Sequence, residues 1–515
     1  MTDGATIARP VPAIASGPAA LRIDERDNVA VALRLINAGD RIEVAGEPLV
    51  ARQEIPAGHK IALVALEPEQ SIIKYGVPIG LAMSPIQRAD WLHSHNLTTA
   101  LSGVQDYAYA PSLAAPLPAS RFPLPATFNG YRRPTGRVGT RNELWVLNTV
   151  GCVNHAAERI AKQAAERFAR RIDGVHAFAH PYGCSQLGDD LRNTQRVLAG
   201  LLRHPNAGAV LILGLGCENN QLDQLMALAG PIDRERVAFF NTQDVIDELE
   251  EGTGAVARLV ERMSADQRTE CPASDLVLGH KCGGSDGFSG ISANPLLGRI
   301  ADRLTAFGGT VLLTEVPEMF GAEQLLMNRA VSEPVFRDIV SMVNDFKDYF
   351  IRHNQPVYEN PSPGNKAGGL TTLEEKSLGA IQKGGRASVS RVLRYGEPVT
   401  EHGLSLLESP GNDGVSSTAM VVSGATVLLF TTGRGTPLGF PVPTIKVSSN
   451  SEIAAKKPHW IDFNAGGLLD GSATMPQLED DLFAMVLAVA SGERLANNET
   501  NDYREIAIWK DGVTL

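Results

Sequence analysis

The stretch ELWVLNTVGCVNHAAERIAKQAAERFARR, residues 143–171, sets the fold class of this chain. Residues 143–150 form an apolar run that is long enough for one buried strand. A glycine turn follows, and residues 154–171 then repeat apolar side chains at helical spacing. A strand that passes through a short turn into an amphipathic helix is the repeating unit of a parallel α/β sheet.

The same pattern recurs along the chain. The strand-like runs after the first one are VHAFAH (175–180), AGAVLILGLG (207–216), DLVLG (275–279), GTVLLTEV (309–316) and ATVLLFTTG (425–433). Each of the first four leads through a loop into a helix-like stretch, and a further helix is expected at 478–493. We therefore predict an α/β protein with a Rossmann-like parallel sheet.

The regions before residue 128 have a different composition, so we expect several domains in a chain of 515 residues. Residues 1–21 are predicted to be a disordered extension, 22–107 a small β-rich module, and 108–127, with five prolines, an extended linker. Residues 128–355 are assigned to a central α/β domain and 356–515 to a C-terminal α/β domain.

Composition excludes several classes of function. The net charge is −11 and there is no basic run, which argues against nucleic-acid binding. No run of 18 apolar residues is present, so no membrane span is expected, and the N-terminus lacks the pattern of a secretory signal. Five cysteines do not indicate a disulfide framework, and we expect reduced thiols in the cytoplasm.

Four of the cysteines follow predicted strands. Cys152, Cys184, Cys217 and Cys282 each come just after a strand and just before a helix, beside glycine. Glu315 and Glu318 follow the next strand, whereas Cys271 precedes its strand. Ligands bind at the carboxyl edge of parallel sheets, and helix N-termini there lower thiol pKa values. The sequence predicts that these thiols gather at one edge, as metal ligands, as ligands of an iron–sulfur cluster or as pocket lining; their spacing matches no zinc-ribbon or ferredoxin pattern.

Three histidines in the N-terminal module are candidates for proton transfer or metal binding. His59 lies in a turn ahead of a strand. His93 and His95 form an H-x-H pair that we place on one face of a strand. For each of these taken alone, a solvated loop histidine is the slightly favoured interpretation.

Two loops have the composition of anion sites. Residues 360–366 (NPSPGNK) offer a rigid turn with an amide and an ammonium group. Residues 431–436 (TTGRGT) place the Arg434 guanidinium between glycines, which suits a carboxylate. Neither loop is a Walker A motif.

Several motifs resemble those of the altronate/galactarate dehydratase family, from about residue 25 to the C-terminus. They are CGGSDGFSG (282–290) with ANP (293–295), TEVPEMFGAEQLL (314–326), ENPSPGNKAGG (359–369), TTGRGTP (431–437) and HWIDFNAG (459–466). The N-terminal module, with GHK at 58–60, KYG at 74–76 and HSHN at 93–96, is similar to the family's small β-clip (SAF) domain. The motifs TVGCVN (149–154), YGCSQLGDD (182–190) and GLGCENNQ (214–221) are closer to the altronate-acting members than to the galactarate-acting members.

The resemblance implies a metal-assisted hydro-lyase that converts D-altronate to 2-dehydro-3-deoxy-D-gluconate in hexuronate catabolism. It implies dependence on Fe(II), with Mn(II) as a substitute, and no organic cofactor. The only partner expected is the small sugar-acid substrate, and a homo-oligomer is compatible with the sequence.

The chemistry needs a proton acceptor, a proton donor, a cation and groups that bind the substrate. His59 is the leading acid/base candidate, followed by Lys366, Lys376 and Asp286. The candidate substrate-binding residues are Arg434, Asn365, Ser285, Asn294 and Thr432. The candidate metal-site residues are Cys184, Cys217, Cys282, Glu315, Cys152, His93 and His95.

Three alternatives stay open. The chain could be a galactarate dehydratase, a lyase that carries an iron–sulfur cluster, or a non-catalytic sugar-acid-binding protein, since β-clip modules also occur as carbohydrate-binding units.

Overall fold

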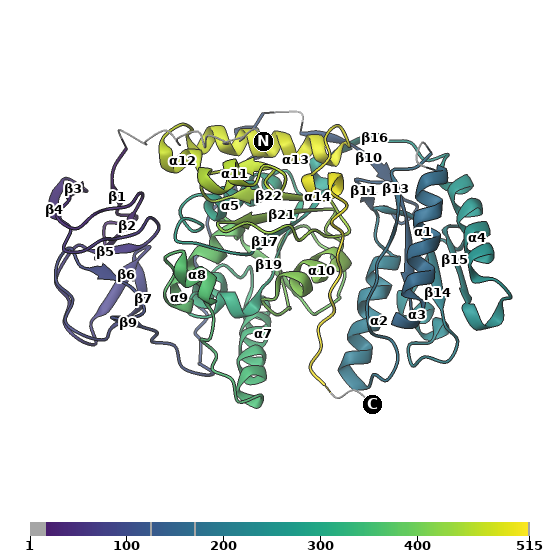
Figure 1. Ribbon diagram of the computed structural model, residues 1–515, viewed down its shortest axis with the longest axis horizontal. Coiled ribbons are helices and arrows are strands. Elements are labelled where there is room, and N and C mark those ends of the chain that lie inside the picture. Colours follow the sequence, from purple (N-terminus) through teal and green to yellow (C-terminus); the bar gives the residue numbers. More distant parts are fainter. Residues whose placement is uncertain (1–16, 124–125, 169–170, 513–515) are drawn as a thin grey trace, which may run out of the picture.

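A computed structural model describes residues 17–123, 126–168 and 171–512, which form three bodies arranged side by side (Figure 1). Their order in space differs from their order in the sequence. The N-terminal module lies at one end and the α/β body that follows it lies at the other. The body formed by the C-terminal half of the chain lies between them.

The N-terminal module is built from strands alone, as predicted, and its described residues up to 100 contain no helix. Its three antiparallel sheets have the orders β1-β2-β5-β8, β3-β4 and β6-β7-β9. The strands are β1 (Ala20–Leu21), β2 (Val29–Ala32), β3 (Arg41–Val44), β4 (Glu47–Val50), β5 (Lys60–Ala62), β6 (Ser71–Lys74), β7 (Val77–Ala82), β8 (Trp91–Leu92) and β9 (Leu97–Thr98).

The predicted disordered extension ends earlier than expected. Its residues 1–16 lie outside the described residues, but Ala20 and Leu21 pair with β2 as strand β1. This strand completes a sheet edge. The predicted boundary at residue 21 is therefore wrong.

The proline-rich linker, predicted at 108–127, is only partly without regular structure. Residues 101–118 contain no helix or strand and run along the third body, whereas Ala119–Arg121 form a 3-10 helix and β10 begins at Thr127. The side chain of Asn344 donates a hydrogen bond to the carbonyl of Gln105 at 3.0 Å, and the amide of Ser112 donates to the carbonyl of Asn328 at 2.7 Å. The linker thus carries the chain past the third body before the second body begins.

The second body is a parallel α/β domain with the strand order β13-β12-β14-β15. Its elements are β12 (Glu143–Asn148), α1 (Asn154–Phe168), β13 (Gly174–Ala177), α2 (Gly188–Leu202), β14 (Ala207–Gly214), α3 (Leu222–Ala229), β15 (Val237–Asn241) and α4 (Glu248–Met263). A small antiparallel sheet of β10 (Thr127–Arg132), β11 (Val138–Gly139) and β16 (Thr269–Pro272) connects it to the rest of the chain.

The alternation of side chains along β12 explains its two helical layers. Leu144 and Val146 belong to the core shared with α1 and α4, whereas Trp145 and Leu147 belong to the core shared with α2 and α3. Both faces are covered, so the strand reads as one continuous apolar run.

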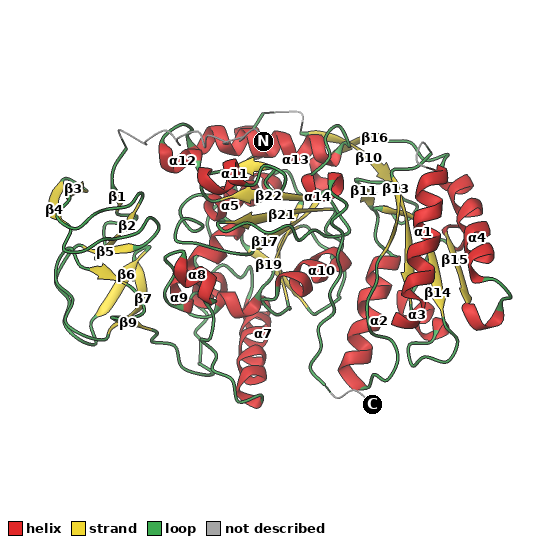
Figure 2. Ribbon diagram, viewed as in Figure 1, coloured by secondary structure: helices red, strands yellow, loops and turns green. Residues whose placement is uncertain are grey.

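The third body contains a seven-stranded parallel sheet with helices around it (Figure 2). Its strand order is β19-β20-β18-β17-β21-β22-β23, with bounds β17 (Val277–Cys282), β18 (Thr310–Leu313), β19 (Val389–Leu393), β20 (Gly403–Leu407), β21 (Val427–Thr432), β22 (Thr444–Ser448) and β23 (Phe463–Asn464). Its helices are α5 (Ala293–Ala306), α6 (Glu323–Met327), α7 (Glu333–Arg352), α8 (Pro363–Ala367), α9 (Leu373–Ala380), α10 (Asp413–Ser423), α11 (Ser451–Lys456), α12 (Gly467–Asp470), α13 (Met475–Ala490) and α14 (Asn497–Thr500).

The predicted domain boundary at residue 355 is wrong. Strands β17 and β18, which we assigned to the central domain, are hydrogen-bonded to β21 and β20 of the C-terminal half. One sheet is shared by residues 277–464, so the change of domain comes near β16. No helix in the described part of the chain has the length and hydropathy needed to cross a membrane.

Candidate active site

The carboxyl ends of the strands in the third body meet around β17. This strand is bonded to β18 on one side and to β21 on the other, so the chain order diverges there. Ligands of open α/β sheets bind at such a point. Backbone hydrogen bonds join the loop after β17 to the end of β21 and the loop that follows it. The Gly283 amide donates to the Thr431 carbonyl at 3.0 Å, and the Arg434 amide donates to the Gly284 carbonyl at 2.9 Å.

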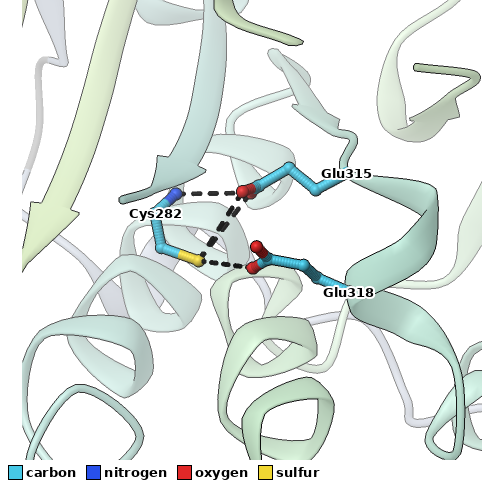
Figure 3. A group of neighbouring side chains, drawn as sticks. All are labelled: Cys282, Glu315 and Glu318. Carbon is cyan, nitrogen blue, oxygen red and sulfur yellow. Dashed lines mark hydrogen bonds between the residues drawn. The ribbon is translucent and has the colours of Figure 1, made fainter. Parts of the chain in front are cut away.

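One thiol and two carboxylates meet at this edge. Cys282 ends β17, and its Sγ lies 3.4 Å from a carboxylate oxygen of Glu318 and 3.8 Å from both oxygens of Glu315 (Figure 3). A ligand atom of each residue lies within 4.8 Å of one on the other two, and all three residues are buried. We call this group the thiol–carboxylate cluster.

A strained turn holds the two carboxylates together. Glu315 has φ +70° and ψ 56°, a left-handed conformation that is costly for a residue with a side chain. The Glu318 amide donates to the Glu315 carbonyl at 2.7 Å, so the chain turns directly after β18. The turn directs both carboxylates toward Cys282 (Figure 3).

Two buried lysines neutralise the inner part of the cluster. Lys383 Nζ lies 2.9 Å from Cys282 Sγ and 2.5 Å from a Glu315 oxygen. Lys281 pairs with Glu315 and, at 2.7 Å, with Asp413, whose side chain is 36% exposed. Asp413 is therefore the point where this ion network reaches solvent.

A third lysine connects the cluster to the loop at 360–369. Lys376 Nζ lies 2.8 Å from Glu318 and 3.0 Å from the amide oxygen of Asn360. It also donates to Asn365 at 3.3 Å, and the Asn365 amide in turn donates to the Ser285 carbonyl at 2.8 Å. Asn365 thus bridges the ammonium group and the loop after β17.

The electrostatics of the cluster favour charged lysines and a neutral thiol. Burial disfavours ionisation of Glu318, but the ammonium groups, above all Lys376, outweigh it and hold its pKa at about 2. Burial, reinforced by the Glu315 carboxylate, raises the pKa of the Cys282 thiol to about 12. Burial lowers the pKa of Lys383, but Cys282 and Glu315 more than offset this, and the net shift is upward.

The thiol–carboxylate cluster fits a divalent cation by donor type and by distance. One sulfur and two carboxylate groups can share an ion when their ligand atoms are this close. Sulfur and oxygen donors together suit a borderline cation such as Fe(II), and carboxylates also suit Mn(II). Before the Cys282 sulfur can bind a cation, the thiol must lose its proton and the contact between Lys383 and the sulfur must break.

A cavity of about 460 Å³ lies between the N-terminal module and the third body. Its wall includes Arg34 from the module and Asp286, Arg434, Asn450 and Lys456 from the third body. The wall also includes Glu452 and Asp470, so three cationic side chains face three carboxylates. The Arg434 guanidinium is the group in this wall that suits a carboxylate ligand.

The Asp286 carboxylate is hydrogen-bonded to the loops around this cavity. It accepts hydrogen bonds from the hydroxyls of Ser289 (2.9 Å) and Ser449 (2.9 Å) and from the amide of Asn450 (3.0 Å). Burial raises its pKa, although these hydrogen bonds act in the opposite direction. The arrangement holds the loops after β17 and β22 together.

His59 lies where the N-terminal module contacts the third body. The Trp91 indole donates to its Nδ1 at 3.1 Å, which leaves the proton on Nε2, 3.4 Å from the Ala367 carbonyl. Its ring stacks on that of His93 at 5.1 Å between centroids. Burial lowers the pKa of His59 to about 4, so the imidazole is neutral at neutral pH.

The H-x-H pair does not lie on a strand, so that prediction is wrong. His93 and His95 lie in the turn between β8 and β9, because the Asn96 side chain accepts from the His93 amide and closes the turn. His93 Nε2 bonds to the carbonyl of Lys366 at 2.9 Å, whereas His95 is exposed. Neither histidine joins a group of metal-ligand type among the described residues.

The four cysteines do not share one edge, which corrects the prediction. Cys152, Cys184 and Cys217 follow β12, β13 and β14 of the second body and are exposed, whereas Cys282 is buried in the third body. The four strands have similar strand-to-helix patterns in the sequence, and such a pattern does not indicate which sheet a strand joins. Cys271 is buried in β16, away from both edges.

Two other predicted substrate-binding residues use their side chains to hold the loops. The Asn294 amide donates to the Gly379 carbonyl at 3.0 Å, and Thr432 Oγ1 accepts from the Gly435 amide at 2.9 Å. Ser285 is buried beside Asp286. These residues lie at the predicted edge of the sheet.

Sequence reasoning missed Lys281, Lys383 and Asp413. Lys281 precedes Cys282 directly, which was a usable signal. Lys383 lies 101 positions after Cys282, with no motif to connect them. Long-range ion pairs of this kind depend on the fold rather than on local spacing.

Family models match almost the whole chain. The chain matches "Altronate/galactarate dehydratase SAF domain" over residues 18–100, "D-galactarate dehydratase/Altronate hydrolase, second domain" over 130–264, and "D-galactarate/Altronate dehydratase, C-terminal" over 273–514. The change of model between 264 and 273 agrees with the change of sheet near β16.

Curated relatives match over nearly their full lengths. The chain is 51% identical over 501 residues to altronate dehydratase of Escherichia coli (strain K12) and 49% identical over 501 residues to that of Bacillus subtilis (strain 168). Each match covers 96% of this chain and 99% of the relative. Galactarate dehydratase (L-threo-forming) of Escherichia coli is 34% identical over 493 residues, which cover 92% of this chain and 93% of that protein.

Proposed function

The chain belongs to the D-galactarate/altronate dehydratase family, and from this membership we propose that it is a hydro-lyase that dehydrates altronate. The choice of altronate as the substrate rests on the difference in sequence identity. The chain is 49% and 51% identical to two altronate dehydratases, against 34% to a galactarate dehydratase. The reaction belongs to hexuronate catabolism, and five free cysteines support a cytoplasmic location.

The reaction removes a proton from C2 and a hydroxyl group from C3 of the sugar acid. The resulting enol takes up a proton at C3 and becomes the 2-keto acid, here 2-dehydro-3-deoxy-D-gluconate. One group must accept the C2 proton and another must protonate the departing hydroxyl.

We propose the thiol–carboxylate cluster of Cys282, Glu315 and Glu318 as the place for Fe(II), with Mn(II) as a substitute. When bound, the cation supplies stabilisation of the negative charge that develops on the substrate's oxygen atoms. The support is the donor set and its mutual distances below 4.8 Å.

Lys376 is the proposed proton donor to the leaving hydroxyl. It lies at the outer side of the cluster, and its contacts with Glu318 (2.8 Å) and Asn360 (3.0 Å) fix the ammonium group. Its link through Asn365 brings it toward the loop that lines the cavity.

His59 stays the proposed acceptor of the C2 proton. Its low pKa of about 4 keeps the imidazole neutral, as a base must be, and its neighbours Ala57 and Ala367 line the cavity. The imidazole must exchange its contact with Trp91 for the substrate. Arg434, in the cavity wall, is the proposed partner of the substrate carboxylate.

The experiment is turnover of altronate in heavy water under anaerobic conditions, with Fe(II) present. We expect a 2-keto acid that carries one deuterium at C3, because the enol takes its proton from solvent. If altronate raises the melting temperature but no 2-keto acid forms, the protein is a sugar-acid-binding protein instead. Faster turnover of galactarate would favour that substrate.

A further inference from the structure

The second body carries three exposed thiols that the proposed reaction does not use. Cys152, Cys184 and Cys217 follow the adjacent parallel strands β12, β13 and β14. Because β12 lies between β13 and β14, the carboxyl ends of all three strands meet at one edge. Each thiol is therefore presented at the same edge of the four-stranded sheet.

Backbone hydrogen bonds tie the three cysteine loops to one another. The Gly151 amide donates to the Tyr182 carbonyl at 2.9 Å, which joins the first loop to the second. The Asn220 amide donates to the Gly183 carbonyl at 2.9 Å, which joins the third loop to the second. Each bonded residue lies within three positions of a cysteine, so the thiols are held on one patch.

The loop of Cys184 is fixed in an uncommon conformation. Gly183 has φ +106°, and a Cβ there would lie 2.0 Å from the Thr149 carbonyl oxygen. Ser185 has φ +56°, and its amide donates to the Asn219 side chain at 2.7 Å. Gly183 adopts its conformation without cost, whereas the left-handed Ser185 stores strain, which is typical of functional loops.

The helices that begin at this edge suit an anionic group. Helices α1, α2 and α3 begin close after the three loops, and their free amides point toward this edge. The carboxylate of Glu218, the residue after Cys217, is hydrogen-bonded within its own loop. It accepts from the Leu215 and Gly216 amides at 3.0 and 2.7 Å. It is not free to serve as a metal ligand.

The spacing of the three sulfur atoms argues against a single metal ion. The three do not form a set with all ligand atoms within 4.8 Å, in contrast to the cluster in the third body. A single tetrahedral ion with metal–sulfur bonds of about 2.3 Å needs sulfurs about 3.8 Å apart. A polynuclear cluster, in which bridging sulfides separate the irons, takes thiolates from a wider triangle.

We propose that Cys152, Cys184 and Cys217 bind an iron–sulfur cluster of the [4Fe–4S] type through three of its irons. The remaining cysteines cannot supply a fourth thiolate, because Cys271 and Cys282 are buried in other sheets. The fourth iron is therefore open to an oxygen ligand. This site is separate from the thiol–carboxylate cluster and does not depend on the proposed dehydration.

The test is anaerobic reconstitution of the full chain with equal amounts of ferric and ferrous iron and with sulfide, followed by removal of unbound reagents. We expect about four irons and four acid-labile sulfides per chain, with the visible absorbance of thiolate-to-iron charge transfer. The triple variant Cys152→Ser, Cys184→Ser, Cys217→Ser is expected to lose the sulfide and the absorbance. Its thermal unfolding without metal should match that of the parent, because the three side chains are exposed.

The matched control is Cys271→Ser, in which the hydroxyl can replace the thiol that donates to the Thr269 carbonyl. This variant should retain the full sulfide content. Iron without sulfide in the parent chain, or unchanged sulfide in the triple variant, would overturn the proposal. A chain that turns over altronate but holds no sulfide would overturn this site alone and leave the proposed function standing.

Discussion

At the scale of single residues, His59 shows how a catalytic and a structural role can share one side chain. Its two ring nitrogens contact Trp91 and the Ala367 carbonyl, so it also holds the N-terminal module against the third body. An alanine variant would remove both roles at once. Glutamine is the sharper substitution, since its amide can keep a donor and an acceptor.

We expect His59→Gln to lower kcat for altronate by about 100-fold or more, because a side-chain amide cannot accept the proton. The melting temperature should stay close to that of the parent. His402→Gln, an exposed histidine before β20, is the matched control and should keep full activity. Near-normal turnover by His59→Gln would assign the residue to docking only.

Gly433 lies where the loops after β17 and β21 touch. A Cβ at this position would lie 2.3 Å from a carboxylate oxygen of Asp286, and Asp286 is fixed by several hydrogen bonds. We expect Gly433→Ala to destabilise the protein by about 1–3 kcal/mol in urea unfolding and to raise KM for altronate. Gly364→Ala, where a Cβ meets nothing within 4 Å, should change stability by less than about 0.5 kcal/mol. Equal effects of the two substitutions would contradict this account of the loop contact.

At the scale of elements, a buried ion triad attaches the N-terminal module to α9. Lys60 on β5 and Lys74 on β6 each lie 2.8 Å from the Glu375 carboxylate, and all three side chains are buried. Burial alone would raise the pKa of Glu375, but the two ammonium groups outweigh it and hold the pKa far below its usual range. Removing one partner leaves charge buried without compensation.

We expect Glu375→Gln to reduce the free energy of unfolding by about 3–5 kcal/mol. The control is Glu47→Gln, which removes the exposed pair between Glu47 and Arg88 at 3.0 Å and should cost less than about 1 kcal/mol. Urea unfolding followed by circular dichroism measures both. A cost for Glu375→Gln as small as that of the control would show that the triad does not secure the module.

Element types were predictable from the sequence, but the sheet that each strand joins was not. Period and composition identified the strand at 275–279 and the strand at 425–433. Their pairing as β17 and β21 spans about 150 residues and leaves no local pattern. For the same reason the thiols were expected at one edge, whereas Cys282 belongs to the seven-stranded sheet of the third body. The ends of strands predicted that Cys282, Glu315 and Glu318 lie at one edge, where the structure has them together. The buried lysines that neutralise this cluster could not be found without the fold.

At the scale of the whole molecule, buried neutral histidines make stability depend on pH. Burial lowers the pKa of His204 to about 3 and that of His280 to about 4, against about 6.5 when unfolded. The unfolded chain therefore binds more protons than the folded chain between these values. Stability should be constant just above pH 6.5 and fall as the pH decreases below it.

We expect each of these histidines to contribute a slope of about 1.4 kcal/mol per pH unit within that window. Urea unfolding at a series of pH values measures the slope. The His204→Gln variant should lose one histidine's share of it, since Gln does not titrate. An unchanged slope in this variant would contradict the assignment of His204 as a neutral buried group.

The third body is the centre of the molecule in both architecture and chemistry. It carries the thiol–carboxylate cluster, shares the cavity with the N-terminal module and shares an apolar core with α2 of the second body. The most direct test of the account is kcat/KM of the Fe(II)-loaded, anaerobic protein for altronate and for galactarate, with 2-keto acid as the readout. We predict that altronate is preferred by about 100-fold or more. Absence of keto acid from altronate, or equal or higher values for galactarate, would contradict it.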